Sequence, residues 1–206
     1  MVMQQESRRS PGRPKKNPQL DQQTSLLILR TAAASFMEFG YEKVSLDHIA
    51  KQCGVTKATV YYYYANKANL FTESVVTMFR NITQHVTRYL TQPKPLKERL
   101  LDIAAVQMGN EYGEFETLMK EASSHLSAEQ IERIRQGEVS VHHVMIEGFQ
   151  EGIKTGDLAD YDPMLLSLAF ASMLMMGNRE LMMQQYDNHQ DAAQAIVELF
   201  WNGAGK

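Results

Sequence analysis

Apolar residues recur at the three- and four-residue spacing of a helix face through most of the chain. This spacing predicts two short helices within residues 45–64, and longer helices over about 22–39, 66–90, 96–108, 114–125, 128–155, 163–186 and 191–202. Pro93 and Pro95 are expected to end the long helix that starts near residue 66, because proline cannot continue a helix. The sequence therefore predicts an all-α protein.

Residues that cap helices flank several of these segments. Ser127 and Gln130 form a capping box, in which the side chain of each bonds to the backbone of the other. Gly156 suits the end of that helix, and Asp162 followed by Pro163 suits the start of the next one. These residues set the expected helix ends in the second half of the chain.

Residues 45–64 describe two short helices joined by a turn at Gly54, which is the plan of a helix-turn-helix. Thr56 can cap the second helix, and Val60 and Tyr64, four residues apart, form its only apolar face. The rest of this helix faces outward. A helix so short and so exposed needs an external partner, and the plan implies that the partner is double-stranded DNA.

The outward residues have side chains suited to DNA. Thr59 can reach a base edge or a thymine methyl group in the major groove, whereas tyrosine hydroxyls and lysines contact phosphates. The candidate phosphate contacts are Tyr61, Tyr62, Tyr63, Lys57 and Lys67. The alternative is that the tyrosines make an adhesive face that packs on another domain or subunit.

From Ile28 to Phe71 the chain resembles the tetracycline-repressor (TetR) family of bacterial transcription regulators. It follows the family pattern at Ile28-Leu29, Ala32, Phe36, Gly40-Tyr41, Ile49-Ala50, Gly54-Val55, Thr59-Val60-Tyr61-Tyr62, Asn66-Lys67 and Leu70. The resemblance implies an N-terminal three-helix DNA-binding domain and a C-terminal helical bundle for ligand binding and dimerisation. It also implies that Lys57, Ala58, Thr59 and Tyr61 approach bases, and that Ser45, Tyr62, Tyr63 and Lys67 hold the DNA backbone.

Three residues depart from the family pattern. Tyr63 stands where the family usually has histidine, and Tyr64 where it usually has phenylalanine. The second change puts a phenol hydroxyl into a small core, where it needs a hydrogen-bond partner. Asp47 lies on the first helix of the motif, where a basic or polar residue is common, so DNA readout from that position is not expected.

The N-terminal residues form a basic arm over 1–21 that is expected to be disordered in solution. Its candidate DNA contacts are Arg13, Lys15 and Lys16. Gly12-Arg13-Pro14 resembles the core of an AT-hook and could enter an A·T-rich minor groove, although Pro11 replaces that motif's first arginine. A solvated tail that raises affinity without selecting sequence is the alternative.

Charge is divided unevenly along the chain. Residues 1–70 carry a net charge of +5, whereas residues 71–206 carry −8. A basic module is drawn to a polyanion and an acidic remainder is repelled by it, so this division orients the protein on DNA. A single cysteine and the absence of an apolar segment long enough to cross a membrane predict a cytoplasmic protein associated with the nucleoid.

The predicted helices over 163–186 and 191–202 are apolar on more than one side. One side can serve the protein's own core, and the other is expected to meet the same helices of a second copy in a two-fold homodimer. We therefore divide the chain into the arm, a helix-turn-helix domain over 22–82, and a helical effector-binding and dimerisation domain over 83–206.

Thirteen methionines suggest an adaptable cavity for a small apolar or amphipathic effector, although each residue could instead fill the core. The candidates are Met108, Tyr112, Phe115, Met119, His142, Met145, Phe149, Phe170, Met173 and Asn178. Adjacent His142 and His143 point to different helix faces and cannot chelate one ion. No metal or cofactor is expected.

The sequence thus predicts a DNA-binding regulator, most simply a ligand-released repressor that acts as a homodimer on an inverted-repeat operator. A DNA-bound structural or division-control protein could use the same fold. An enzyme is the remaining alternative, but the chain has no glycine-rich phosphate loop, no Gly-x-Ser-x-Gly elbow and no His-Glu-x-x-His pair.

Overall fold

The computed structural model describes residues 18–108, 115–177 and 180–206. Its elements are α1 (Pro18–Phe39), α2 (Leu46–Gln52), α3 (Lys57–Tyr64), α4 (Lys67–Leu90), α5 (Leu96–Met108), α6 (Phe115–Ala122), the 3-10 turn η1 (Ser123–His125), α7 (Ala128–Thr155), α8 (Pro163–Gly177), α9 (Glu180–Met183) and α10 (His189–Ala204). These elements confirm the predicted all-α class. None of the helices in these ranges has both the length and the apolar content that crossing a bilayer requires.

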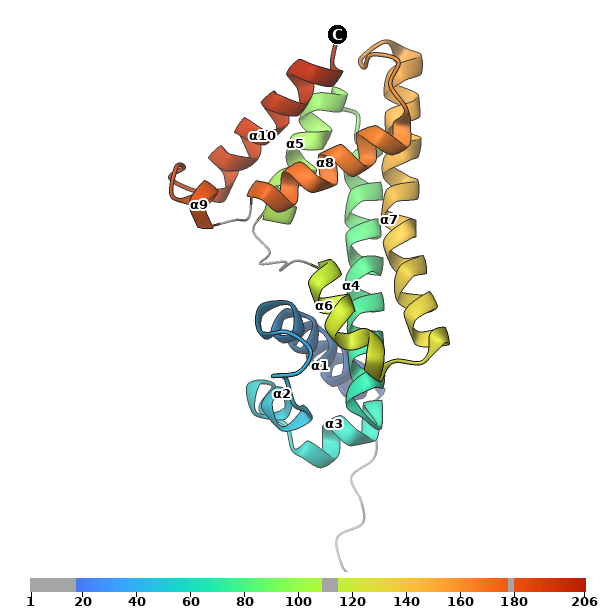
Figure 1. The fold of residues 1–206 in the computed structure, drawn as a ribbon, viewed down its shortest axis with the longest axis vertical. Coiled ribbons are helices and arrows are strands. Elements are labelled where there is room, and N and C mark those ends of the chain that lie inside the picture. The colour runs from blue at the N-terminus through green and yellow to red at the C-terminus, as the bar shows by residue number, and fades with distance from the viewer. Residues whose placement is uncertain (1–17, 109–114, 178–179) are drawn as a thin grey trace, which may run out of the picture.

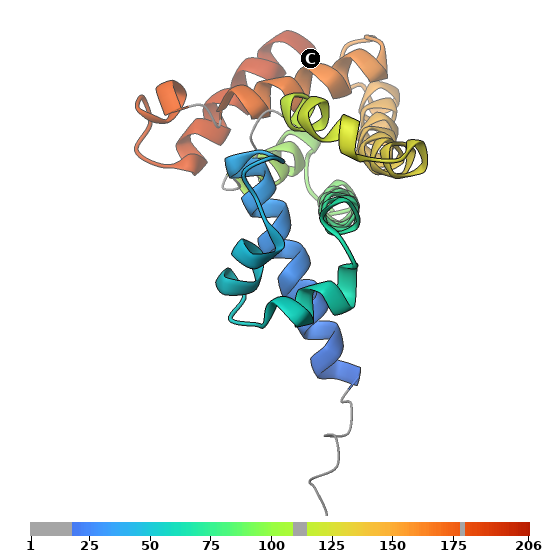
Figure 2. The same cartoon turned by 60° about the horizontal axis from the view of Figure 1, so that its bottom comes forward.

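Two groups of helices lie at opposite ends of the long helix α4. Helices α1, α2 and α3 lie beside its first half, and α5, α8 and α10 gather beside its second half (Figure 1). Helix α7 runs back along α4, and Figure 2, which looks nearly along α4, shows the first group on one side of it. The predicted helix-turn-helix therefore lies at one end of the molecule.

The buried side chains form two cores. The first contains Phe36 and Phe71 together with Phe115 of α6 and Ile134 of α7. The second lies among α4, α5, α7, α8 and α10. Ile82 of α4 packs against both. The predicted division at residue 82 therefore falls inside an unbroken helix, and the first core draws residues from both sides of it.

Helix ends agree with the capping residues and differ from the periodicity by four residues or more only at α1 and α8 among the described helices. Helix α1 is already helical at Pro18, the first described residue, four residues before the predicted start, and proline suits a first helical turn. Helix α8 ends at Gly177, whereas the periodicity predicts a single helix over 163–186. A β-carbon at Gly177 would press on the ends of the Ile196 and Met108 side chains, which would have to shift, and glycine itself weakens a helix.

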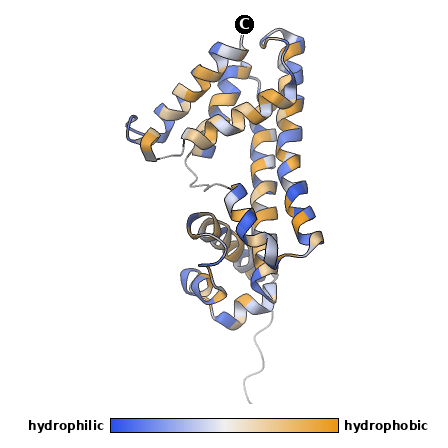
Figure 3. Ribbon diagram, viewed as in Figure 1, coloured by the Kyte–Doolittle hydropathy of each residue, from blue (hydrophilic) through white to orange (hydrophobic). Residues whose placement is uncertain are grey.

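Several exposed side chains on the helices of the second group are apolar. Figure 3 shows apolar residues along much of α8 and α10. The exposed ones on α8 include Leu165, Leu168, Met175 and Met176, and Leu199 is exposed on α10.

The end of α7 provides a test of the fold. Gly156 has a φ of 83°, the left-handed conformation that disfavours side chains, and a β-carbon added there would meet no described atom within 4 Å. We expect Gly156→Ala to lower the free energy of unfolding by about 1 kcal/mol. Gly203→Ala, inside α10 and also free of clashes, is the control and should raise it by up to about 1 kcal/mol. Urea denaturation measures the free energy of unfolding of both variants. Equal effects would contradict the left-handed conformation assigned to Gly156.

Candidate nucleic-acid interface and cavity

Helices α2 and α3 meet at a tight turn. Ser45 caps α2 by accepting a hydrogen bond from the backbone N–H of His48 at 3.1 Å, and Thr56 caps α3 by accepting one from the backbone N–H of Thr59 at 3.1 Å. Between them Gly54 has a φ of 66°, which glycine adopts at little cost. The predicted caps and turn are confirmed.

The inner face of α3 fastens it to α1. Val60 and Tyr64 are buried in the first core. The Tyr64 hydroxyl lies 2.7 Å from the Ser25 hydroxyl and donates to the Ser25 carbonyl at 3.1 Å. Burial raises the pKa of Tyr64 above its ordinary value. Ser25 is thus the partner that the sequence analysis required for this phenol group.

The outer face of α3 is open. Ala58 is exposed, Tyr61 is 45% exposed and Tyr62 is 60% exposed, while Thr59 is half-buried. The tyrosines are therefore not covered by neighbouring side chains, and together they present hydroxyl groups and ring faces beside a small residue. Such a surface suits a groove whose base edges carry donors, acceptors and methyl groups.

Lys57 lies at the edge of this face. Its ammonium forms an ion pair with Asp47 of α2 at 2.7 Å and lies 5.8 Å from the centre of the Tyr61 ring. The hydrogen bond from Lys57 to Asp47, followed by the attraction of that carboxylate, raises the pKa of Lys57. Ion pairs as exposed as this one contribute little to stability. Lys57 can therefore leave Asp47 for a phosphate or base at small cost.

Two of the predicted backbone contacts have partners inside the protein. Lys67 donates to the carbonyl of Glu42 at 3.1 Å and lies 4.4 Å from the centre of the Tyr41 ring, and burial lowers its pKa. The Tyr63 hydroxyl donates to Asp21 at 3.3 Å. Lys67 thus fastens α4 to the turn between α1 and α2, a role that the sequence analysis did not assign.

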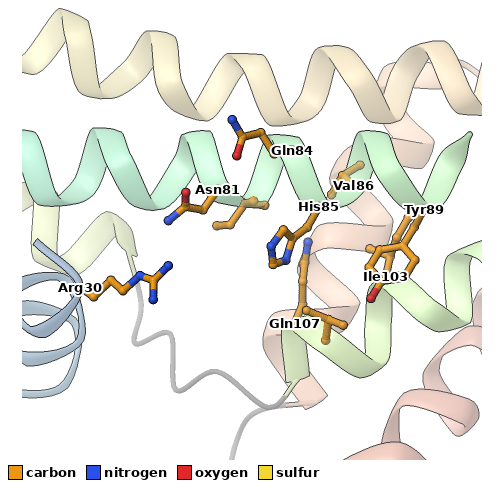
Figure 4. A pocket seen from close by; sticks show the side chains of 10 residues that line it. Arg30, Asn81, Gln84, His85, Val86, Tyr89, Ile103 and Gln107 are labelled. Carbon is orange, nitrogen blue, oxygen red and sulfur yellow. The ribbon is translucent and has the colours of Figure 1, made fainter. Parts of the chain in front are cut away.

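A cavity of about 630 Å³ lies between α1, α4 and α5, and its size is within the usual range for ligand sites (Figure 4). Figure 4 shows Arg30 reaching in from α1, Asn81 and His85 from α4, and Gln107 from α5. The remaining lining residues are Ile82, Gln84, Val86, Tyr89, Ile103 and Val106. One element of the helix-turn-helix module therefore helps to enclose it.

A model of the bacterial regulatory proteins of the tetR family matches residues 28–73, the stretch that contains this helix-turn-helix. The chain belongs to the TetR family. Members with this helix-turn-helix are transcriptional regulators, so the chain is a TetR-family transcriptional regulator.

Three known proteins are similar to this TetR-family chain. The HTH-type transcriptional regulator YhgD of Bacillus subtilis is 24% identical over 71% of this chain and 78% of its own. The negative transcriptional regulator IcaR of the biofilm operon of Staphylococcus epidermidis is 34% identical, over 30% of this chain and 33% of its own. The structure of AibR with isovaleryl coenzyme A and operator DNA has a TM-score of 0.65 at 19% identity, over 85% of this chain and 97% of that one. The last likeness shows a shared fold.

The predicted apolar effector residues that the structure describes are divided between the two cores of this TetR-family fold. Phe115 and Met119 belong to the first core, whereas Met108, Met145, Phe149 and Phe170 belong to the second. None of those that the structure describes lines the cavity in Figure 4. Tight packing explains this, since large apolar side chains at helical spacing fill a core before they line a ligand site.

The other predicted residues are placed as follows. His142 lies 2.9 Å from the Ser167 hydroxyl, and Met173 is half-buried against the second core. Tyr112 and Asn178 lie outside the described residues, as do Arg13, Lys15 and Lys16 of the arm.

The cavity residues were not predicted from the sequence, although α4 carries a signal for them. Asn81, His85 and Tyr89 are four residues apart and thus lie on one face of the helix. A polar stripe inside a helix that is otherwise packed on two cores indicates a face turned toward water or a ligand. Arg30 and Gln107 have no comparable signal, because they come from other helices.

The bond between Tyr64 and Ser25 provides a second test. We expect Tyr64→Phe to lower the free energy of unfolding by about 1 kcal/mol, because it removes a hydrogen bond beside the first core. Tyr161→Phe is the control, since Tyr161 is 47% exposed and its change should have almost no effect. Urea denaturation compares the two, and an unaltered midpoint for Tyr64→Phe would show that the bond does not hold α3 to α1.

Proposed function

We propose that the chain is a repressor that occupies an inverted-repeat operator as a homodimer and leaves it when a ligand fills the cavity. The observation that carries the proposal is the open outer face of α3, with exposed Tyr61 and Tyr62 beside Lys57. Two of the similar proteins support its two parts, since IcaR is a negative regulator and AibR forms a complex with isovaleryl coenzyme A and operator DNA.

The DNA-binding role is assigned to α3 in the major groove, which admits one helix. Lys57, Ala58, Thr59 and Tyr61 are proposed to approach bases, and Ser45 and Tyr62 to hold phosphates. Tyr63 and Lys67 are proposed to act on the DNA backbone only by leaving their partners inside the protein. The basic charge of residues 1–70 would orient this face toward the duplex.

The homodimer is assigned to the exposed apolar stripe of α8 and α10. Leu165, Leu168 and Met175 follow helical spacing along α8, and Leu199 lies on the neighbouring α10. Apolar residues in contiguous exposed rows mark interaction surfaces. A second copy is the occupant that DNA binding favours, because a two-fold dimer places two α3 helices on the two halves of an inverted repeat.

Ligand release is assigned to α4, which lines the cavity with one half and joins α3 with its first turn. A packed helix moves as a unit, so a shift at the cavity changes the angle of the module. The proposed domains are thus a DNA-binding unit over 22–82 and an effector and dimer unit over 83–206, coupled by this helix.

The assignment of α3 predicts a loss of DNA binding on substitution of Tyr61. DNA fragments selected from random sequence with the purified protein serve as probe. We expect Tyr61→Ala to bind them roughly tenfold or more weakly while remaining a dimer, because a groove contact is lost. Tyr161→Ala, an equally exposed tyrosine far along the chain, should retain its affinity. Equal retention of both variants in a gel shift assay would count against the proposal.

The dimer surface predicts a change of assembly on substitution of Leu168, which is 48% exposed. We expect Leu168→Glu to raise the dimer dissociation constant by more than about a hundredfold, because two-fold symmetry buries two unpaired carboxylates together. Leu20→Glu is the control, since Leu20 is 59% exposed on α1 at the other end of the molecule. Sedimentation analysis measures both, and an unchanged dimer for Leu168→Glu would exclude this face.

A further inference from the structure

Several polar side chains in the cavity lack partners within the described part of the chain. Arg30, Asn81, His85 and Gln107 line it from three helices, and none has a hydrogen bond or ion pair to another residue that the structure describes. Other polar side chains of α4 bond to a backbone carbonyl, as Thr83 and Thr87 do. Donors and acceptors that converge on one hollow without satisfying each other can bind a polar ligand group.

The charge of the cavity selects an anion. Among the described residues that line it, Arg30 is the one arginine or lysine, and there is no aspartate or glutamate. A guanidinium presents a planar fork of donors that matches the two oxygens of a carboxylate or phosphate. The amides of Asn81 and Gln107 and the imidazole of His85 line the same hollow and can donate further hydrogen bonds to polar groups of a ligand.

The other end of the cavity is apolar. Figure 4 shows Tyr89 and Ile103 on the side away from Arg30, with Asn81 and His85 between them. Val86 and Ile103 are buried in the second core, and Ile82 and Val106 also line the wall. A ligand that fills the cavity therefore has a cation at one end and mainly hydrocarbon at the other.

We infer that the cavity binds an amphipathic organic anion, with its head on Arg30 and its apolar tail between α4 and α5. This deepens the proposed function, on which it rests for its regulatory meaning. Because Arg30 belongs to α1, the bound anion links the helix-turn-helix module directly to the long helix. Occupancy thereby favours the one orientation of the module in which Arg30 reaches the ligand head.

Binding of simple probes to the full chain tests this inference. Decanoate, decanol and inorganic phosphate are compared by isothermal titration, because decanol has the tail alone and phosphate has the anion alone. We expect decanoate to bind at least roughly tenfold more tightly than either of the other two, because only decanoate satisfies both ends of the cavity. Equal binding of decanoate and decanol would overturn the inference.

Two variants locate the head group. Arg30→Gln should weaken decanoate binding roughly tenfold or more and leave decanol binding unchanged, because it removes one charge-assisted interaction. Arg80→Gln is the matched control, since Arg80 is also an exposed arginine but lines a different groove, between α4 and α7. Equal losses in the two variants would overturn the role of Arg30.

A separate measurement of DNA binding distinguishes a failure of the proposed repressor function from a failure of the ligand assignment. If the protein retains no DNA fragment but binds decanoate through Arg30, the proposed function fails and the ligand assignment stands. If DNA is bound and decanoate releases it from the native chain but not from Arg30→Gln, both stand. Release of DNA from both proteins alike would overturn the link between Arg30 and the module.

Discussion

The structure depends on the packing of α4 into both cores at once. Phe71 and Phe79 anchor its first half in the first core, Val86 and Leu90 anchor its second half in the second, and Ile82 touches both. Helix α7 packs along it, contributing to each core. A close-packed interior resists local deformation. Neither end of α4 can therefore move without disturbing contacts at the other, which makes this helix a means of joining events at the two ends of the molecule.

The beginning of α4 meets the helix-turn-helix module at the short turn after α1. Lys67 donates to the carbonyl of Glu42 there, and Glu121 of α6 accepts a hydrogen bond from the backbone N–H of Tyr41 at 3.1 Å. His125 lies 2.7 Å from the Glu42 carboxylate and stacks on Tyr41. Elements from both halves of the chain thus hold one turn. Helix α2 follows that turn directly and packs against α3, so the turn helps to set the orientation of α3.

The helix ends could be predicted from neighbouring residues, whereas contacts between distant segments could not. The capping residues Ser45, Thr56 and Ser127 bond within their own first turns, so neighbouring residues decide them. The need of Tyr64 for a partner could also be predicted, but not that Ser25, 39 residues away, would meet it. Likewise Arg30 and Gln107 share a cavity only because α1 and α5 approach α4 from the same side. The spacing of the methionines and phenylalanines likewise indicates a buried face without telling what is buried against it.

The position of the cavity reduces the distance over which regulation must act. A ligand can shift an equilibrium between two orientations only as far as its affinity for them differs. A cavity enclosed wholly by the second core would create that difference through small displacements passed along α4. This cavity instead includes Arg30, a residue of the module itself, so its distance from the ligand changes whenever the module turns. The same contact that binds the ligand thereby discriminates between orientations, and α4 needs only to keep the two halves in register.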